Sequence, residues 1–317
     1  MNKRCLYCYG EMADLEQFDY HPTCSLAFFG SKTPPSLNYA LCEMNELAKE
    51  VVTHRIAVPG VQPKLSLSLI DEVLNQKNVT RLTVVGALGG NYIFKPPSST
   101  YPAMLENEHL TMKIAEAFGV KTVPSSLIRL QSGELAYITK RIDRTLDGQK
   151  IHMLDMFQIT DAVDKYKSTM ERVGKALKQY STDTLMDLFK YFELTVFCFL
   201  TGNNDMHLKN FSMIEKDGKW SLSPAYDLLN VHLANPKDKE ELALSLEGKK
   251  RKFTRHHFER FGSHLGLNKK QINGVLDRSV KKQSMAKSLI KASFLSEEMQ
   301  DDYWEIMLRA YKALQAA

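Results

Sequence analysis

Three polar residues in the second half of the chain have the chemistry and spacing to support phosphoryl transfer. Asp205 precedes Asn210 by five positions, and Asp227 follows shortly after a predicted hairpin. Phosphoryl transfer needs a group that accepts the proton of the attacking hydroxyl and oxygen ligands that hold Mg²⁺ against the phosphates. Asp205 is placed for the first task, and Asn210 and Asp227 are placed for the second. Because this spacing alone is only moderately specific, the rest of the chain must supply the other parts of such a site.

A lysine at the end of an apolar strand is the candidate for contacting nucleotide phosphates. Lys95 closes the segment 92–95, where it could reach phosphates as a point charge. Taken alone it would be an ordinary surface lysine, but the three residues above favour a functional role. Glu106 and Glu108 open the next predicted helix, where acidic residues also stabilise the helix dipole. Either glutamate could orient Lys95, and the sequence does not choose between them.

A loop containing glycine and proline is the candidate for covering the phosphates. It precedes a predicted strand and consists of Pro59, Gly60, Val61, Gln62, Pro63 and Lys64. The chain contains no Walker motif, and the two prolines lack the N–H groups that bind phosphate, so a simple turn is the alternative. The glycine-rich segment 86–90 is interpreted as a hairpin turn. Within the loop 205–210, His207 and Lys209 could contact phosphate oxygens, and Lys209 could offset charge in the transition state.

Hydrophobic patterning predicts strands in the first part of the chain and helices in the second. Strands are predicted over 65–69, 82–85, 92–95, 126–130 and 135–139, and helices over 37–53, 105–118, 153–164, 168–179 and 183–200. A hairpin over 211–214 and 220–222 interrupts the later helices, and the last hundred residues are expected to be mostly helical. The predicted fold class is α+β, with a strand-rich N-terminal lobe over residues 1–143 and a helical C-terminal lobe over residues 144–317.

The composition favours an ordinary globular protein. Hydrophobic residues make up 44% and charged residues 25%, and the net charge of +5 fits a normal surface with spare lysines better than a nucleic-acid-binding surface. Basic stretches such as 249–252 are interpreted first as solvated faces and second as a surface for a partner. No segment is apolar enough for a membrane span or a signal peptide, and the five cysteines fit a reducing compartment. A cytoplasmic protein is therefore expected, although export by a specialised route would leave no mark in the sequence.

Four residues near the N-terminus have the spacing of a zinc site. Cys5 and Cys8 form one pair, and His21 and Cys24 form a second. The alternative is that they are small buried residues that hold the N-terminal segment against the lobe beneath it. A zinc-dependent nucleic-acid binder is a weaker hypothesis, because the first thirty residues are not notably basic.

Six segments together resemble the HipA family of bacterial serine/threonine kinases, the toxins of toxin–antitoxin modules. They are residues 58–64, 93–95, 106–108, 140–144, 204–212 and 224–227. The resemblance implies a protein-kinase-like fold, Mg·ATP as phosphoryl donor and a protein serine or threonine as acceptor. In characterised members the acceptor is an aminoacyl-tRNA synthetase, whose phosphorylation inhibits translation. The residues that the resemblance assigns to the nucleotide site are Pro59, Gly60, Val61, Gln62, Pro63, Lys64, Lys95, Lys140, Arg141, Ile142, His207, Leu208, Lys209, Asn210, Tyr226 and Asp227.

The chain departs from the family pattern in two places. Full-length HipA proteins carry a further subdomain ahead of the phosphate loop, whereas here that loop starts near residue 59, as in the short HipT type. The expected partners are a small antitoxin resembling the missing subdomain and a helix-turn-helix antitoxin, through which nucleic acid would be reached only indirectly. The family's loop also carries an autophosphorylated serine, where this chain has Ala57, Val58 and Pro59. Ser66 and Ser68 lie beyond the glycine, on a predicted strand.

Two functions are consistent with these residues. The first is an active serine/threonine kinase with Asp205 as catalytic base and with Asn210 and Asp227 as magnesium ligands. The alternative is a nucleotide-binding pseudokinase or a module that binds an antitoxin without turnover. Lys95, Asp205, Asn210 and Asp227 are all present in the sequence. This favours the active kinase, because a kinase that has lost activity during evolution has usually lost one of these residues.

Overall fold

The computed structural model describes residues 3–13, 17–44, 46–47, 64–74, 77–84, 90–98, 101–145 and 147–316. The chain divides into two compact units. Unit 1 contains Met1–His109 and Val123–Lys150, and unit 2 contains Leu110–Thr122 and Ile151–Ala317. Helix α3 (Met104–Phe118) therefore begins in unit 1 and ends in unit 2. The lobe boundary predicted at residue 143 lies near the chain position where unit 1 ends.

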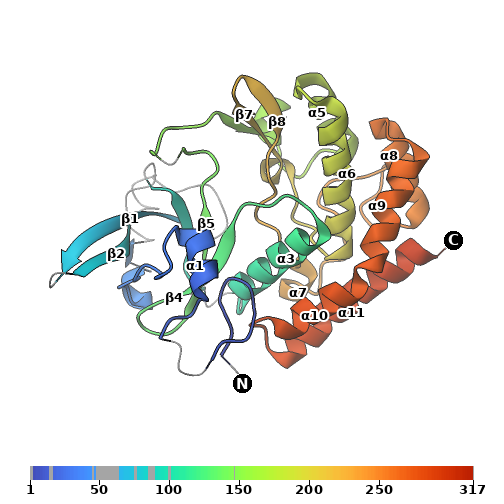
Figure 1. Ribbon diagram of the computed structural model, residues 1–317. Coiled ribbons are helices and arrows are strands. Elements are labelled where there is room, and N and C mark those ends of the chain that lie inside the picture. Colours follow the sequence, from blue (N-terminus) through green and yellow to red (C-terminus); the bar gives the residue numbers. More distant parts are fainter. Residues whose placement is uncertain are drawn as a thin grey trace. The chain divides into compact units, whose positions relative to one another are not determined.

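Unit 1 is built on a five-stranded antiparallel sheet with the order β2-β1-β3-β5-β4 (Figure 1). Its strands are β1 (Leu65–Leu74), β2 (Lys77–Val84), β3 (Tyr92–Lys95), β4 (Ser125–Arg129) and β5 (Leu135–Lys140), and helix α1 (Pro22–Phe29) precedes them. Buried residues such as Leu65, Phe94 and Ile138 form its core. The five predicted strands are confirmed, with bounds shifted by a few residues, and α3 ends at Phe118, as predicted.

The predicted hairpin turn at 86–90 is wrong. Leu67 of β1 lies opposite Val84 of β2 on one side and Tyr92 of β3 on the other, so β2 and β3 are not neighbours. The reason is that β1 is longer than its alternating pattern indicated and pairs first with β2, which leaves its other edge to β3. Of the predicted helix over 37–53, residues 37–44 and 46–47 are described; 41–44 and 46–47 are helical, whereas 37–40 are not.

Unit 2 is mainly helical, with one small sheet in the order β6-β7-β8. Its elements are β6 (Met153–Asp155), α4 (Met156–Ile159), α5 (Met170–Tyr180), α6 (Thr184–Leu200), the 3-10 turn η1 (Leu208–Asn210), β7 (Ser212–Lys216), β8 (Lys219–Leu222), α7 (Val231–Ala234), α8 (Arg255–Leu265), α9 (Lys269–Lys281), α10 (Gln283–Ala292) and α11 (Glu297–Gln315). Among the described residues, no helix is both long and apolar enough to span a bilayer.

The helices and the hairpin predicted for this unit are confirmed, except for the helix over 153–164. Residues 153–155 pair with β7 as strand β6, and only 156–159 are helical. The Asp155 side chain accepts a hydrogen bond from the Gln158 N–H and so begins a new short helix. The hairpin turns through Asp217 and Gly218, both at positive φ, as a tight turn between antiparallel strands requires.

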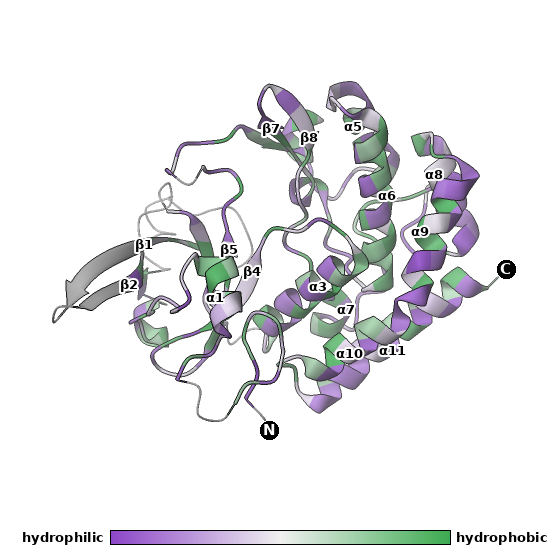
Figure 2. Cartoon of the chain, in the orientation of Figure 1, coloured by the Kyte–Doolittle hydropathy of each residue, from purple (hydrophilic) through white to green (hydrophobic). Residues whose placement is uncertain are grey.

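Helix α6 is the centre of unit 2. It packs against α5, α8, α9 and α11, and hydrophobic residues are concentrated along it (Figure 2). Asp187, buried in its first turns, accepts hydrogen bonds from the Ser181 hydroxyl (2.6 Å) and the Leu222 N–H (2.8 Å), which fastens the helix to β8. The direction of α6 therefore fixes where the following loop begins.

Close helix packing in unit 2 depends on a glycine. A Cβ atom on Gly262 would lie 2.7 Å from Ile272 Cγ1 and 3.2 Å from a Phe192 ring carbon. We expect Gly262→Ala to lower the free energy of unfolding by about 1–3 kcal/mol, because overpacking outweighs the better helix propensity of alanine.

The matched control is Gly274→Ala in α9, where the added methyl meets only the end of a flexible arginine side chain. It should leave stability unchanged or raise it by about 0.5–1 kcal/mol. Chemical denaturation of both variants measures the difference. Equal effects of the two substitutions would contradict the packing argument.

Candidate active site

The segment that carries Asp205 begins where the buried helix α6 stops. Gly202 has φ 65°, and the next residue, Asn203, donates its N–H to the Cys198 carbonyl (2.9 Å). A Cβ atom at Gly202 would lie 2.8 Å from Ile306 Cγ2 and 3.0 Å from His232 Cδ2. Both the backbone conformation and the space therefore favour glycine at this position.

The backbone carbonyl of Asp205 holds the following turn. It accepts hydrogen bonds from the His207 N–H (2.8 Å) and from the Asn210 side-chain Nδ2 (2.9 Å). Met206 and Leu208 point into the core and are fully buried. Asp205 and Asn210 are thus brought together by a direct contact, as their spacing predicted. Because the Asn210 nitrogen is engaged by Asp205, its amide oxygen is the atom that can bind a cation.

The Asp205 carboxylate has a neighbour that the sequence did not reveal. The Tyr166 hydroxyl donates to Asp205 Oδ1 at 2.7 Å, and the Tyr166 ring meets the His207 ring edge-on at 4.9 Å. Burial and the adjacent carboxylate raise the pKa of Tyr166, so it remains a donor at neutral pH. Tyr166 lies in an irregular segment far upstream of Asp205, where neither motif nor periodicity marks it.

Asp227 is connected to the same turn through Tyr226. The Tyr226 hydroxyl donates to the Lys209 carbonyl (3.1 Å) and lies 2.5 Å from the Ser212 hydroxyl. Asp227 itself has φ 54°, a left-handed conformation that aspartate tolerates better than most residues. Burial lowers the pKa of His207, and the negative charges of Asp205 and Asp227 oppose this shift.

Lys209 acts electrostatically on a second carboxylate, Asp155, that the sequence did not single out. Its ammonium lies 4.9 Å from the centroid of the Phe157 ring. Burial raises the pKa of Asp155, while the positive charge of Lys209 acts in the opposite direction. Asp155 comes from the first strand of the small sheet, where the sequence had predicted a helix.

In unit 1, Lys95 pairs with Glu108. The lysine ammonium lies 2.7 Å from both carboxylate oxygens, and both side chains are buried. The structure thereby chooses between the two glutamates that the sequence left open. Glu106 is half-buried, and burial raises its pKa. The ammonium also lies 5.3 Å from the centroid of the Tyr137 ring, which further defines its position.

Among the residues that the resemblance assigns to the nucleotide site, Arg141 makes mainly structural contacts. Arg141 donates to both carboxylate oxygens of Asp143 (2.9 and 2.7 Å) and to the Ser66 hydroxyl (3.2 Å). Burial alone would raise the pKa of Asp143, but the hydrogen bond and charge of Arg141, with Arg144, hold it below its usual value. Lys140 ends β5, and burial lowers its pKa. Ser66 lies in strand β1, as predicted, and its side chain is buried.

Most residues of the predicted phosphate loop lie outside the part of the chain that the structure describes. Of the phosphate loop, Pro59, Gly60, Val61, Gln62 and Pro63 lie outside the described residues, as do Ala57 and Val58, and only Lys64 is described, directly before β1. Ile142 follows β5 and is partly exposed, and Leu208 begins η1.

The donors found in unit 2 fit a magnesium ion. Asn210 offers an amide oxygen and Asp227 a carboxylate, and both are hard oxygen ligands. Mg²⁺ characteristically takes one or two protein carboxylates or amides and completes its shell with water and substrate phosphates. The set contains no sulfur or imidazole ligand that would favour a softer metal.

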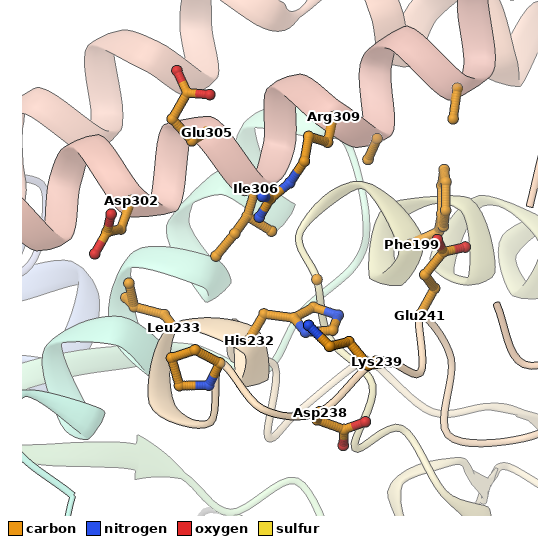
Figure 3. Close-up of a pocket in the computed structure, with 14 residues that line it drawn as sticks. Phe199, His232, Leu233, Asp238, Lys239, Glu241, Asp302, Glu305, Ile306 and Arg309 are labelled. Carbon is orange, nitrogen blue, oxygen red and sulfur yellow. The ribbon is translucent and has the colours of Figure 1, made fainter. Parts of the chain in front are cut away.

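A cavity of about 510 Å³ lies elsewhere in unit 2 (Figure 3). Arg309 and Ile306 extend into it from α11, opposite the segments that carry His232, Lys239 and Asp238. None of the residues predicted to bind the nucleotide lines it. It is therefore not the site that the catalytic segment forms.

Comparison with known proteins identifies the family of this chain. A family model described as the HipA-like C-terminal domain matches residues 56–287. A protein of Haemophilus influenzae that is provisionally named a kinase is 26% identical over 286 residues, covering 81% of this chain and 80% of the relative. The chain spans about half the length of three further curated relatives.

Two solved structures have a similar fold. One is HipA of Shewanella oneidensis, from a complex with HipB and operator DNA, with a TM-score of 0.67 and 20% identity over 84% of this chain and 71% of that chain. The other is the Helicobacter pylori proinflammatory kinase CtkA, with a TM-score of 0.56 and 14% identity over 82% of this chain and 91% of that chain. These likenesses confirm the predicted α+β, protein-kinase-like fold class.

The buried pair of unit 1 generates a stability prediction. Glu108→Gln removes the negative charge that faces the buried Lys95 ammonium, and we expect the free energy of unfolding to fall by about 3 kcal/mol. Glu106→Gln is the matched control, because burial raises the pKa of Glu106 itself, which means that the folded protein disfavours a charged carboxylate there. That variant should be as stable as the wild type at neutral pH, or more stable. Chemical denaturation measures the free energy of unfolding of both variants. Similar losses of this free energy in both would contradict a stabilising role of Glu108 as the partner of Lys95.

The cavity residue His232 generates a prediction about pH. Burial and Arg309 lower the pKa of His232, against the opposing charges of Asp238 and Glu241. As pH falls through the ordinary histidine pKa of about 6.5, the unfolded chain takes up a proton that the folded protein resists, so stability is lost. His232→Gln should lack this loss, so its melting temperature should fall less than that of the wild type between pH 8 and pH 5.5. The exposed His256→Gln should follow the wild-type curve, and a His232→Gln curve parallel to the wild type would refute the assignment.

Proposed function

Because the chain belongs to the family of the HipA-like C-terminal domain, we propose that it is an ATP-dependent serine/threonine-protein kinase. The observation that carries the proposal is the arrangement of the segment 205–210. The Asp205 carbonyl is bonded to the Asn210 amide, and the Asp205 carboxylate is left at the edge of the core with one oxygen bonded to Tyr166. A base and a metal ligand are thus held by the same short turn.

In this proposal Asp205 accepts the proton of the attacking hydroxyl. The hydrogen bond from Tyr166 to Oδ1 fixes the carboxylate and leaves Oδ2 for the acceptor. Lys209, whose charge acts on the Asp155 carboxyl, could bind phosphate oxygens. Lys95, oriented by Glu108, contacts the nucleotide phosphates in the way that the sequence resemblance implies.

Asn210 and Asp227 are the proposed magnesium ligands. When bound, the ion would neutralise charge on the phosphates of ATP. The Tyr226 hydroxyl, bonded to the Lys209 carbonyl, keeps the Asp227 segment attached to the catalytic turn. The remaining proposed nucleotide contacts are Pro59 to Lys64, Lys140 to Ile142, His207 and Leu208, on the strength of the sequence resemblance.

We extend the proposal to the biological role. The Shewanella neighbour was solved with HipB and operator DNA, which supports a toxin that works with antitoxin partners. As the resemblance to the short HipT type implies, those partners would be a small antitoxin and a helix-turn-helix antitoxin. The proposed acceptor is an aminoacyl-tRNA synthetase, whose phosphorylation would inhibit translation.

A nucleotide-binding pseudokinase is the second candidate. A pseudokinase would bind the nucleotide through Lys95 and Asp227 but would not transfer its phosphate. The retained catalytic residue Asp205, with its carboxylate ordered by Tyr166, favours the active enzyme over this candidate. The two candidates differ in a single measurable property, which is the transfer of phosphate.

The test is transfer of labelled γ-phosphate from Mg·ATP to proteins of a bacterial lysate and to the kinase itself. Asp205→Asn should lower the rate about 10²–10⁴-fold, because it removes the base but keeps the size of the side chain. ATP binding by this variant should persist. Asp227→Asn should instead weaken binding of ATP specifically in the presence of Mg²⁺.

Asp217→Asn is the matched control, because Asp217 is exposed in a hairpin turn whose left-handed backbone asparagine accepts. It should transfer phosphate at the wild-type rate. Identification of the labelled lysate protein would name the acceptor. Tight ATP binding with no transfer by the wild type would overturn the kinase and leave the pseudokinase.

A further inference from the structure

The N-terminal segment of unit 1 brings together three thiols and an imidazole. Cys5, Cys8, His21 and Cys24 each offer one ligand atom, and all four atoms lie within 4.8 Å of one another. Two short segments supply them, a tight turn over 5–10 and the start of helix α1. We propose that this cluster is a structural zinc site. It lies outside the residues matched by the family model, 56–287.

The distances between ligand atoms agree with tetrahedral zinc. Zinc bonds of about 2.3 Å to sulfur and 2.0–2.1 Å to nitrogen place sulfur and nitrogen ligands about 3.6 Å apart. His21 Nδ1 lies 3.4 Å from Cys8 Sγ and 3.8 Å from Cys24 Sγ. The histidine nitrogen and two of the thiols therefore already have the separations of a bound shell, and small side-chain rotations would adjust the rest.

The second nitrogen of His21 fixes which atom faces the thiols. Nε2 lies 3.0 Å from the Glu11 carbonyl, an acceptor, so Nε2 carries the proton and donates it. Nδ1 then presents its lone pair to Cys8 and Cys24. A ligating histidine whose other N–H donates to a backbone carbonyl is the usual second contact of zinc sites.

The turn that carries the first two cysteines is shaped around the cluster. The Cys5 N–H donates to the Gly10 carbonyl (2.9 Å), and the Gly10 N–H donates to Cys8 Sγ (3.4 Å). A Cβ atom on Gly10 would lie 3.0 Å from the His21 ring and 3.3 Å from Cys8 Sγ. A backbone N–H directed at sulfur stabilises a thiolate, which is the form that binds zinc.

The burial of these residues argues against a simple packing role. Cys5 is fully buried, but Cys8, His21 and Cys24 are partly exposed. Residues that served only to fill the core would be buried throughout. Three thiols around one imidazole also cannot all be satisfied by a single disulfide, whereas one zinc ion satisfies all four groups.

The proposed site would fasten the N-terminal segment to the sheet of unit 1. Leu6, between the two cysteines, accepts hydrogen bonds from the Leu127 N–H and the Ser126 hydroxyl (both 3.3 Å). The Tyr9 hydroxyl lies 2.9 Å from His109 Nδ1, next to Glu108 of the buried ion pair. Loss of the metal should therefore reduce the stability of unit 1.

The first experiment measures metal in the purified full-length protein after removal of any affinity tag. We expect about one zinc per chain. Cobalt-substituted wild type should give the absorption bands of tetrahedral Co²⁺ with thiolate charge transfer. This spectrum does not depend on kinase activity, so failure of the zinc site and failure of the proposed function are distinguishable.

The variants Cys8→Ser and Cys24→Ser should retain about tenfold less zinc after dialysis against a chelator. Cys42→Ser is the matched control, because Cys42 is an exposed free cysteine outside the cluster. This variant should keep the wild-type zinc content. Because loss of the metal should reduce stability, a chelator should lower the melting temperature of the wild type, and it should lower that of Cys42→Ser by the same amount. Wild-type protein that folds without zinc in zinc-supplemented medium, binds Co²⁺ without tetrahedral bands, or forms a disulfide among these cysteines would overturn the proposal.

Discussion

The end of helix α6 is the constraint on which the candidate site of unit 2 depends. The helix is fixed by its buried faces and by Asp187, so the position of its last turn is determined by packing. Gly202 then turns the chain at positive φ in a space too small for a side chain. The position of the following segment, including Asp205, therefore depends on this turn.

Unit 1 is organised around a different interaction, the buried pair of Lys95 and Glu108. A buried charge pair is stabilising only when its geometry is defined, and two contacts of 2.7 Å define it here. Because Lys95 ends a central strand and Glu108 lies on α3, the pair couples the sheet to the helix. The contacts between Lys95 and Glu108 that join the sheet to the helix thus also fix the position of the Lys95 ammonium.

The sequence predicted which residues of the candidate site lie together where those residues are close in the chain. The spacing of Asp205 and Asn210 was sufficient, because one turn of backbone brings them together. The sequence could not choose between Glu106 and Glu108 as the partner of Lys95. Residues two apart on a helix point in nearly opposite directions, so the rotation of the helix about its axis determines which of them faces Lys95. Tyr166 was missed because its contact with Asp205 is long-range and comes from an irregular segment.

The same distinction explains the errors in the fold. Local patterns identified the strands of unit 1, but the order of the strands depends on pairing between residues that are distant in the sequence. The glycines at 86–90 led to the incorrect prediction that β2 and β3 form a hairpin. Residues 153–155 have helical periodicity, yet they extend because β7 offers an unpaired edge. Long-range support also comes from outside the family match at 56–287, since Ile306 of α11 closes the space around Gly202. The turn that precedes Asp205 is thus positioned partly by a helix that lies outside the residues matched by the family model.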